Sequence, residues 1–364
     1  MSRAQRTVKD DGNHPAIVVA KKRRINCPYI VFILSFIFLS FSKLHAAQVS
    51  SEVINQVVND TTDDFDYRST PGVFGSITSI GSDTLAGLVS LWAEEFKDIY
   101  PHVKFQIQAS GSATASQALT QGTASIGPMS RALTPAEVQR FTQKYGYPPT
   151  TFIVAIDAVS IYVEKNNPLT RLSIPQIDAI FSITRLCGAP TPIRQWSQLD
   201  IGKFGMDRSI EVFGRNSASG TYQLFKGSAL CDGDYDTGVN EMPSSSSVVQ
   251  SVGSSIGGIG YAALGHGNTD VKAIAVGTNG SEFFAPSAQN IRAGLYPFTR
   301  YLYLVVNKPP NQPLPTLERA FISFVLSEEG QAIVEQGNYY PVSGRLLERQ
   351  RRLLQSQILN EISK

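Results

Sequence analysis

Short apolar runs alternate with amphipathic stretches along the chain from Phe74 onward. Residues 77–80 predict a strand, the spacing of apolar residues over 85–99 predicts a helix, and the alternation over 103–107 predicts a second strand. This succession of strand, helix and strand is typical of α/β proteins, in which helices cover mainly parallel sheets. We therefore expect an α/β fold.

Helix-start signals place further elements along the chain. A Thr-x-x-Glu capping box at Thr134 and Glu137, with Pro135 at the first helical position, predicts a helix that runs towards Tyr145. A Ser-x-x-Gln pattern predicts another helix over 173–180. Further helices are expected at 113–119 and 219–225, one or two helices at 316–336, and short strands at 125–127 and 210–213.

Two long apolar runs, 152–163 and 301–306, lie far apart in the sequence, and each leads into Asn and Pro. Such a pair predicts two strands that cross side by side between two lobes. The expected boundaries are 74–157 and 297–343 for the first lobe and 158–296 for the second. Residues 344–364 carry Leu and Ile among Arg and Gln, which predicts an amphipathic helical tail packed on its own protein, with membrane or partner contact as the alternative.

The first 46 residues have the pattern of a secretory signal peptide. Four basic residues at 21–24 precede an apolar run at 29–41, and small residues follow at 46 and 47. A membrane-spanning helix needs about 20 apolar residues. Because the run is shorter than that, we favour a cleaved signal at 1–46 and a periplasmic mature protein, and an uncleaved anchor is the alternative. Residues 47–73 are polar and acidic up to Pro71 and predict a flexible lead-in.

Removal of this leader would change the sign of the net charge. The whole chain carries +2, whereas cleavage after Ala46 would leave 24 basic and 28 acidic residues, a net charge of −4. A mildly acidic surface argues against nucleic acid as a partner, because binding to the phosphate backbone needs a basic face. An anionic ligand would have to be held by local groups.

Cys187 and Cys231 are the two cysteines that follow the leader. An even number in an oxidising compartment predicts a disulfide, here one that closes a loop of some 44 residues. Two buried thiols are the alternative.

Clusters rich in Ser, Gly and Thr stand where a predicted strand gives way to a helix. The first N–H groups of a helix have no internal partner and the helix dipole is positive there, so such a cluster can bind an oxyanion, and glycine lets the backbone approach it closely. The clusters are residues 81–84, 110–114 and 215–221, and residues 127–131 add a second arginine. Their candidate residues are Ser82, Asp83, Thr84, Ser110, Ser112, Ser130, Arg131, Arg215, Ser219, Gly220 and Thr221.

Taken singly, each cluster is explained by helix capping, since Ser, Thr and Asp are the commonest residues at the N-cap. Three clusters in one chain, one of them with an arginine, favour an oxyanion site. The fixed fork of donors in arginine matches the geometry of tetrahedral oxyanions.

The order of these motifs resembles the substrate-binding proteins of ABC phosphate transporters, in which Gly-Ser-x-Thr, Ser-Gly-Ser, Ser-Arg or Ser-Asp, and Arg-x-x-x-Ser-Gly-Thr follow one another. The resemblance covers residues 76–342. It implies a two-lobed, type II periplasmic-binding-protein fold with inorganic phosphate as ligand. An ABC permease in the inner membrane is the implied partner, and we expect a monomer without a cofactor. The implied phosphate ligands are Arg215, Ser219, Gly220 and Thr221, with Thr84, the backbone N–H of Leu85, and Ser112.

One departure from the family pattern bears on selectivity. Some members place an Asp where this chain has Arg131, and that carboxylate accepts the proton of hydrogen phosphate and so discriminates against sulfate. An acceptor buried against sulfate opposes two lone pairs, which costs about 1–3 kcal/mol. Asp83 is our replacement candidate, with Asp157 and Glu241 as weaker ones, and the alternative role of Asp83 is to cap the helix that follows it.

Two rival functions belong to other classes. A secreted phosphatase or hydrolase with a serine nucleophile needs an adjacent base or metal ligands, and the sequence shows His102 and His266 as isolated residues and no metal-binding motif. An exported interaction protein or adhesin would keep the fold without the ligand, and the presence of Arg215 argues against it. A binding protein for another oxyanion, such as sulfate, is a third alternative. We expect binding without catalysis.

Overall fold

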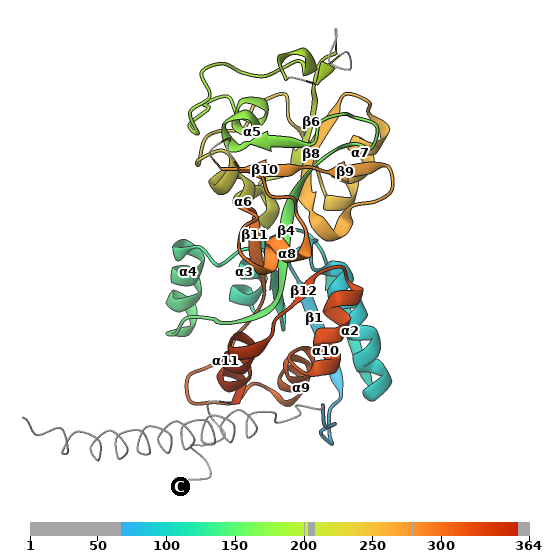
Figure 1. The fold of residues 1–364 in the computed structure, drawn as a ribbon. Helices are drawn as coiled ribbons and strands as arrows, with labels where there is room; N and C mark the ends of the chain where they lie inside the picture. Colours follow the sequence, from blue (N-terminus) through green and yellow to red (C-terminus); the bar gives the residue numbers. More distant parts are fainter. Residues whose placement is uncertain (1–66, 200, 203–207, 279, 281, 356–364) are drawn as a thin grey trace, which may run out of the picture. The chain divides into compact units, whose positions relative to one another are not determined.

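The computed structural model describes residues 67–199, 201–202, 208–278, 280 and 282–355. The predicted signal peptide, most of the predicted lead-in and the last residues of the tail lie outside this range. The described part is an α/β structure in which helices cover the sheets (Figure 1).

Two hydrophobic cores define two lobes. Lobe 1 is built around Trp92, Phe96 and Phe321, and lobe 2 around Phe181, Phe225 and Tyr261. The elements that come before the first crossing strand belong to lobe 1, and they are β1 (Gly75–Ile80), α2 (Ala86–Ile99), β2 (Val103–Gln108), α3 (Ser112–Gln121), β3 (Gly127–Met129) and α4 (Pro135–Tyr145).

Lobe 2 follows the first crossing strand, β4 (Thr150–Glu164). Its helices and strands are β5 (Arg171–Ser173), α5 (Ile174–Phe181), β6 (Glu211–Arg215), α6 (Gly220–Ala229), β7 (Asn240–Met242), α7 (Ser245–Ser254), β8 (Gly258–Ala263), β9 (Val271–Ala273), β10 (Ala275–Gly277) and α8 (Ala288–Arg292). The chain returns through β11 (Thr299–Val306) to α9 (Thr316–Val325), α10 (Glu328–Gln336), β12 (Tyr340–Pro341) and α11 (Gly344–Gln355).

The predicted pair of crossing strands is present. β4 and β11 run side by side with antiparallel pairing from Thr299 opposite Ala158 to Val306 opposite Thr150 (Figure 1). One feature of the prediction was wrong: the sheet that contains these strands is mixed and not mainly parallel. Strands β3, β8 and β12 also pair antiparallel to the crossing strands, whereas β1 with β2 and β6 with β7 and β8 are parallel. The physical reason is that the second crossing runs back along the first.

Each crossing strand contributes residues to both cores, one part of its length to the core of lobe 1 and the other part to the core of lobe 2. On β4, Ala155 belongs to the core of lobe 1 and Ala158 to that of lobe 2. On β11, Phe298 just before the strand belongs to the core of lobe 2, and Leu302 belongs to that of lobe 1. The residues between these positions are therefore the link between the lobes.

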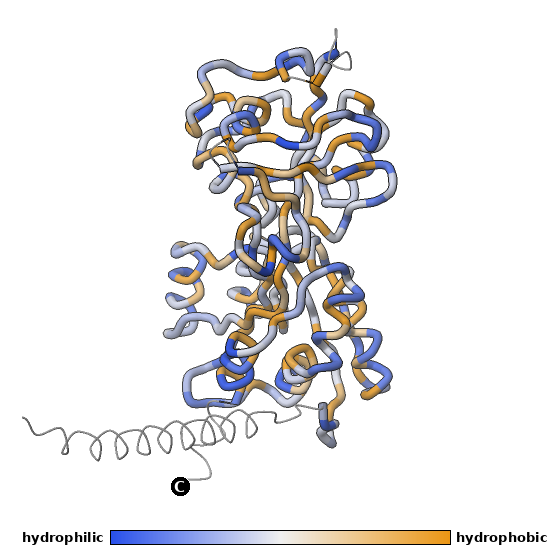
Figure 2. Tube along the Cα trace, viewed as in Figure 1, coloured by the Kyte–Doolittle hydropathy of each residue, from blue (hydrophilic) through white to orange (hydrophobic). Residues whose placement is uncertain are grey.

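The helices that flank the sheets are amphipathic, as Figure 2 shows by the alternation of hydrophobic and hydrophilic positions along α2, α9 and α10. Local signals placed most of them well. Thr134 and Glu137 form the predicted capping box at the start of α4, and Ser173 and Gln176 form the one at α5. The strand expected at 125–127 lies two residues later, at β3, where Met129 pairs with Tyr303 of β11.

Both ends of the described chain pack on lobe 1. The tail helix α11 buries Leu347 and Leu354 in the lobe 1 core, and the Gln350 side-chain oxygen accepts a hydrogen bond of 3.1 Å from the Ile153 backbone N–H. The predicted packing of the tail on its own protein is thus confirmed for residues 344–355. Tyr67, inside the predicted flexible lead-in, stacks edge-on against Phe324, so the described end of that segment is held by the core.

The predicted disulfide is confirmed. Cys187 and Cys231 are bonded, with 5.4 Å between their Cα atoms, and the bridge joins the loop after α5 to the end of α6 in lobe 2. Within the part of the chain that the structure describes, no helix has the length and apolar character needed to span a membrane.

Candidate functional site

The loop between β1 and α2 carries Asp83 and Thr84, both buried. Its backbone is fixed by neighbouring lobe 1 strands, since Gly81 N–H donates to Gln108 over 2.9 Å and Ser82 N–H donates to Pro128 over 2.8 Å. Helix α2 begins after Leu85 without a side-chain cap. The alternative role of Asp83 as an N-cap is therefore wrong, and its carboxylate points elsewhere.

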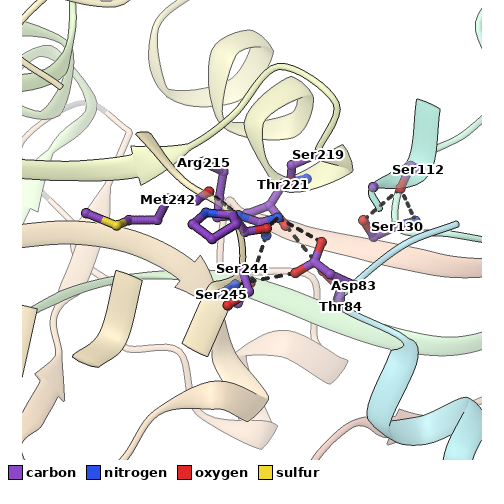
Figure 3. A network of polar contacts seen from close by, with 12 residues as sticks. Asp83, Thr84, Ser112, Ser130, Arg215, Ser219, Thr221, Met242, Ser244 and Ser245 are labelled. Carbon is purple, nitrogen blue, oxygen red and sulfur yellow. Dashed lines mark hydrogen bonds and ion pairs between the residues drawn. The ribbon is translucent and has the colours of Figure 1, made fainter. Parts of the chain in front are cut away.

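Arg215, at the end of β6 in lobe 2, is the partner of that carboxylate. Its Nη2 donates to Asp83 Oδ1 over 2.8 Å (Figure 3), and only 1% of the arginine side chain is exposed. Nη1 donates to Ser245 Oγ over 3.2 Å, and Nη2 also donates to the Pro243 carbonyl over 2.9 Å. A buried guanidinium with partners on both lobes is thus held in one orientation.

Helix α6 begins beside Arg215. Ser219 is its N-cap, and its hydroxyl accepts a hydrogen bond of 3.1 Å from Thr221 N–H. The Thr221 hydroxyl lies 3.4 Å from the hydroxyl of Thr84 in lobe 1. The start of α6 and the loop before α2 therefore face each other across the lobes (Figure 3).

Helix α3 of lobe 1 begins at the same place. Ser112 Oγ accepts a hydrogen bond of 3.0 Å from Ser130 N–H, and Ala113 N–H donates to the Ala218 carbonyl of lobe 2 over 3.2 Å. Packing is so tight that a Cβ added at Gly220 would lie 2.4 Å from Ser130 Oγ and 2.6 Å from Ser112 Oγ. Three helix starts, from α2, α3 and α6, thus meet where the two lobes touch.

A second buried guanidinium, Arg300 on β11, was missed by the sequence reasoning. Its Nε and Nη2 donate to Asp157 Oδ2 on β4 over 2.9 and 2.6 Å, and its Nη1 donates to Thr221 Oγ1 over 3.0 Å. Asp157 was predicted only as a weaker acceptor candidate. One signal was available in the sequence: Asp157 lies within the first of the two runs predicted to cross side by side, and Arg300 directly precedes the second. The sequence does not give the register in which these two strands pair, so it could not show that the two residues are partners.

Arg131 does not join this network. Its Nη1 and Nη2 donate to the two carboxylate oxygens of Glu137 over 2.7 and 2.8 Å at the start of α4. Burial by itself would raise the pKa of Glu137, but the hydrogen bonds from Arg131 and Thr134 hold it below its usual value. The arginine of the fourth cluster thus supports a helix start.

The remaining candidates lie in different surroundings. Ser82 is buried, and its hydroxyl has no hydrogen-bond partner among the residues that the structure describes, whereas Ser110 is exposed. Leu85 places its side chain in the core of lobe 1. Glu241 is exposed on β7. The structure therefore brings Asp83, Thr84, Ser112, Ser130, Arg215, Ser219, Gly220 and Thr221 together and leaves Ser110, Arg131 and Glu241 apart.

The two histidines within the described residues, His102 and His266, lie in different surroundings. His102 is exposed, and His266, which the sequence showed as isolated, has its Nδ1 2.9 Å from Ser246 Oγ. Burial lowers the pKa of His266 below its usual value. Among the described residues, no group of three or more His, Cys, Asp or Glu side chains is arranged to hold a metal ion.

Two lobes joined by crossing strands, with buried guanidinium groups and three helix starts at their contact, define the class of two-lobed solute-binding proteins. Comparison with known proteins agrees with this class. Residues 66–329 match the family model described as the PBP superfamily domain. The chain is 48% identical over 285 residues to the phosphate-binding protein PstS of Pseudomonas aeruginosa, covering 78% of this chain and 88% of that protein.

Solved structures agree as well. A Clostridium perfringens protein with bound phosphate is 26% identical, with a TM-score of 0.62 over 74% of this chain and all of that one. An ABC-type phosphate transport receptor from Vibrio cholerae shares the fold, with a TM-score of 0.57 at 24% identity over 73% of this chain and 100% of that one. The chain therefore belongs to the PBP superfamily and, within it, to the family of the phosphate-binding protein PstS.

Proposed function

We propose that this protein captures inorganic phosphate between its two lobes and delivers it to the permease of an ABC phosphate transporter. The observation that carries the proposal is the meeting of the starts of α2, α3 and α6 around the buried guanidinium of Arg215. The similarity to PstS proteins supports phosphate as the ligand.

The chemistry of the site suits a tetrahedral oxyanion. N–H groups at a helix start and hydroxyl groups donate hydrogen bonds, and the helix dipole places partial positive charge there. Arg215 adds a fixed fork of donors. The ligand set that we propose combines hydroxyls, backbone N–H groups and one guanidinium, from Thr84, Leu85, Ser112, Ser130, Arg215, Ser219, Gly220 and Thr221.

Closure of the lobes over the anion would be the signal that the permease recognises. In such a mechanism the ligand supplies contacts to both lobes and so favours the closed arrangement over an open one. We propose that the protein does this as a periplasmic monomer and without turnover. In support of binding without catalysis, the described hydrogen bonds of the Ser112 and Ser219 hydroxyls are made with the Ser130 hydroxyl and with Thr221 N–H, and neither partner is a general base.

Calorimetric titration of the purified protein with phosphate, sulfate and arsenate between pH 5 and 8 tests this function. We expect heat with phosphate, and binding weakened at least about 100-fold in Arg215→Met, because that change removes the guanidinium and leaves the Asp83 carboxylate buried and unpaired. Arg351→Met is the matched control, since Arg351 is also buried but belongs to α11 and donates to the Leu326 carbonyl.

Two results would overturn the proposal. Absence of heat with phosphate would favour an exported interaction protein that has kept the fold. Hydrolysis of a phosphate ester that is lost in Ser112→Ala or Ser219→Ala would favour the serine hydrolase.

A further inference from the structure

Arg300 and Asp157 occupy the link between the lobes. They are direct cross-strand partners on β11 and β4, and each lies between a residue of the lobe 1 core and one of the lobe 2 core. Only 4% of the Arg300 side chain and 1% of the Asp157 side chain are exposed. An ion pair buried at this point is surrounded by both lobes.

The guanidinium of Arg300 reaches beyond its carboxylate to a threonine on each lobe. Nη1 donates to Thr221 Oγ1 of lobe 2 over 3.0 Å, and Nη2 lies 3.4 Å from Thr84 Oγ1 of lobe 1. Thr84 and Thr221 are the two threonines that face each other at the helix starts, with 3.4 Å between their hydroxyls. Arg300 therefore contacts both hydroxyls from the crossing strand β11.

We propose that Arg300, held by Asp157, is a positioning residue that turns the hydroxyl protons of Thr84 and Thr221 towards the bound anion. This inference rests on the proposed function. It adds a role for the crossing strands, which act on the ligand through the two threonines.

Contact with a guanidinium restricts the direction in which a hydroxyl can point its O–H bond. A hydroxyl has one proton to donate and lone pairs that accept, whereas a guanidinium only donates. When Arg300 donates to a threonine oxygen, that hydroxyl cannot donate back and must send its proton to another acceptor. The two hydroxyls lie 3.4 Å apart, so one can donate to the other, and a charged oxyanion between the helix starts would be a stronger acceptor for both protons.

Charge alone does not explain this placement. Asp157 neutralises Arg300, just as Asp83 neutralises Arg215, so the pair adds no net charge with which to attract an anion. The fork of arginine is the relevant property, because its separate N–H groups contact Asp157 and two threonines at once, which a single ammonium cannot do in this geometry.

A double-mutant cycle measured by calorimetry tests the proposal. Arg300→Met and Thr221→Val are each expected to weaken phosphate binding about 10- to 100-fold, the size of a lost hydrogen bond to a charged group. If Arg300 acts through the threonines, the loss of affinity in the double variant is at least about 3-fold smaller than the product of the two single losses, and what remains of the Arg300 effect is the part that acts through Thr84. Multiplication of the two losses would overturn the proposal, because Arg300 would then act independently of Thr221.

Two further variants serve as controls for this experiment. Arg351→Met removes an arginine that is 7% exposed as a whole residue, as Arg300 is, and should bind within about 3-fold of the native protein. Arg300→Lys keeps the charge beside Asp157, so it serves if the methionine variant does not fold, and it too should bind at least about 10-fold more weakly. Native affinity in Arg300→Lys would overturn the positioning role alone, whereas absence of phosphate binding by the native protein would overturn the proposed function itself.

Discussion

Asp83 Oδ1 accepts a hydrogen bond of 2.8 Å from Arg215 Nη2 and so joins the loop before α2 in lobe 1 to the end of β6 in lobe 2. The second oxygen of the carboxylate lies 3.4 Å from the Ser245 N–H at the start of α7. This one side chain thus orients the guanidinium proposed to bind phosphate and keeps a buried acceptor beside it.

Selectivity for phosphate over sulfate is predicted to depend on Asp83. Asp83→Asn removes the negative acceptor that would oppose the lone pairs of sulfate, so we expect the affinity for sulfate relative to phosphate to rise about 10-fold or more. Parallel calorimetric titrations with the two anions measure the ratio. An unchanged ratio would assign Asp83 only to holding Arg215. Asp234→Asn, at an exposed pair with Lys226, is the control.

Closure of the lobes is predicted to be sensitive to a single methyl group at Gly220. The Cβ in Gly220→Ala would meet the hydroxyls of Ser130 and Ser112, which belong to the other lobe. We expect phosphate affinity to fall at least about 10-fold, the size of a clash that costs more than 1.4 kcal/mol. The thermal unfolding midpoint of the ligand-free protein should change little, because opening of the lobes would remove the clash.

Gly227→Ala provides the matched control on the same helix. Its added Cβ would be 3.6 Å from Asp232 Oδ1, an ordinary contact, and alanine is favoured over glycine inside a helix by up to about 1 kcal/mol. We therefore expect native affinity and equal or greater stability. Equal affinities of the two alanine variants would count against closure at Gly220.

The stabilising role of Glu137 is predicted to disappear in acid. Its pKa in the folded protein is below the usual 4.5, so the unfolded chain takes up the proton first, and its contribution is complete above pH 4.5 and lost as the pH falls through the folded pKa. Glu137→Gln should lower the free energy of unfolding by roughly 1–3 kcal/mol at pH 7, and by progressively less as the pH falls through that range.

Urea unfolding at pH 7, 4 and 3 measures this difference. Glu328→Gln, which changes an exposed carboxylate in the first turn of α10, is the control for a general effect of charge. A difference that stays constant with pH would mean that Glu137 acts through shape and not through its ionised form.

The disulfide is predicted to stabilise lobe 2 without touching the ligand. It links residues 44 apart in sequence, for which the chain-entropy model gives about 4 kcal/mol. The variant with both Cys187→Ser and Cys231→Ser should lose about that much free energy of unfolding in urea while its phosphate affinity stays native. A loss of affinity equal to that of Arg215→Met would connect the bridge to the site.

Local signals in the sequence were enough for much of the fold. Thr134 and Glu137 lie three residues apart, and contacts at that spacing can be read from the order of residues alone. The crossing strands were found because 152–163 and 301–306 are unusually apolar. The lobe boundaries near 157 and 297 stay a prediction, which the change of core on both strands supports.

Contacts between distant parts of the chain were harder to predict. Two arginines were expected at the site, and the second turned out to be Arg300 in place of Arg131. The sequence shows that Arg131 follows a strand, but the choice between an anion and Glu137 depends on where α4 packs. Arg300 gave no motif, because its partners are 143 residues away at Asp157 and 79 away at Thr221.

The position of α11 matters for anyone who wishes to shorten this protein. Its Gln350 side chain accepts a hydrogen bond from the backbone N–H of Ile153 on β4, four positions before Asp157. Leu347 and Leu354 of the same helix belong to the hydrophobic core of lobe 1. A truncated chain that ended at Ser343 would expose to solvent the apolar residues of lobe 1 that α11 covers. It would also leave the Ile153 N–H of the crossing strand without its acceptor. Reporter fusions for sensing phosphate are therefore better attached beyond Gln355 than in place of this helix.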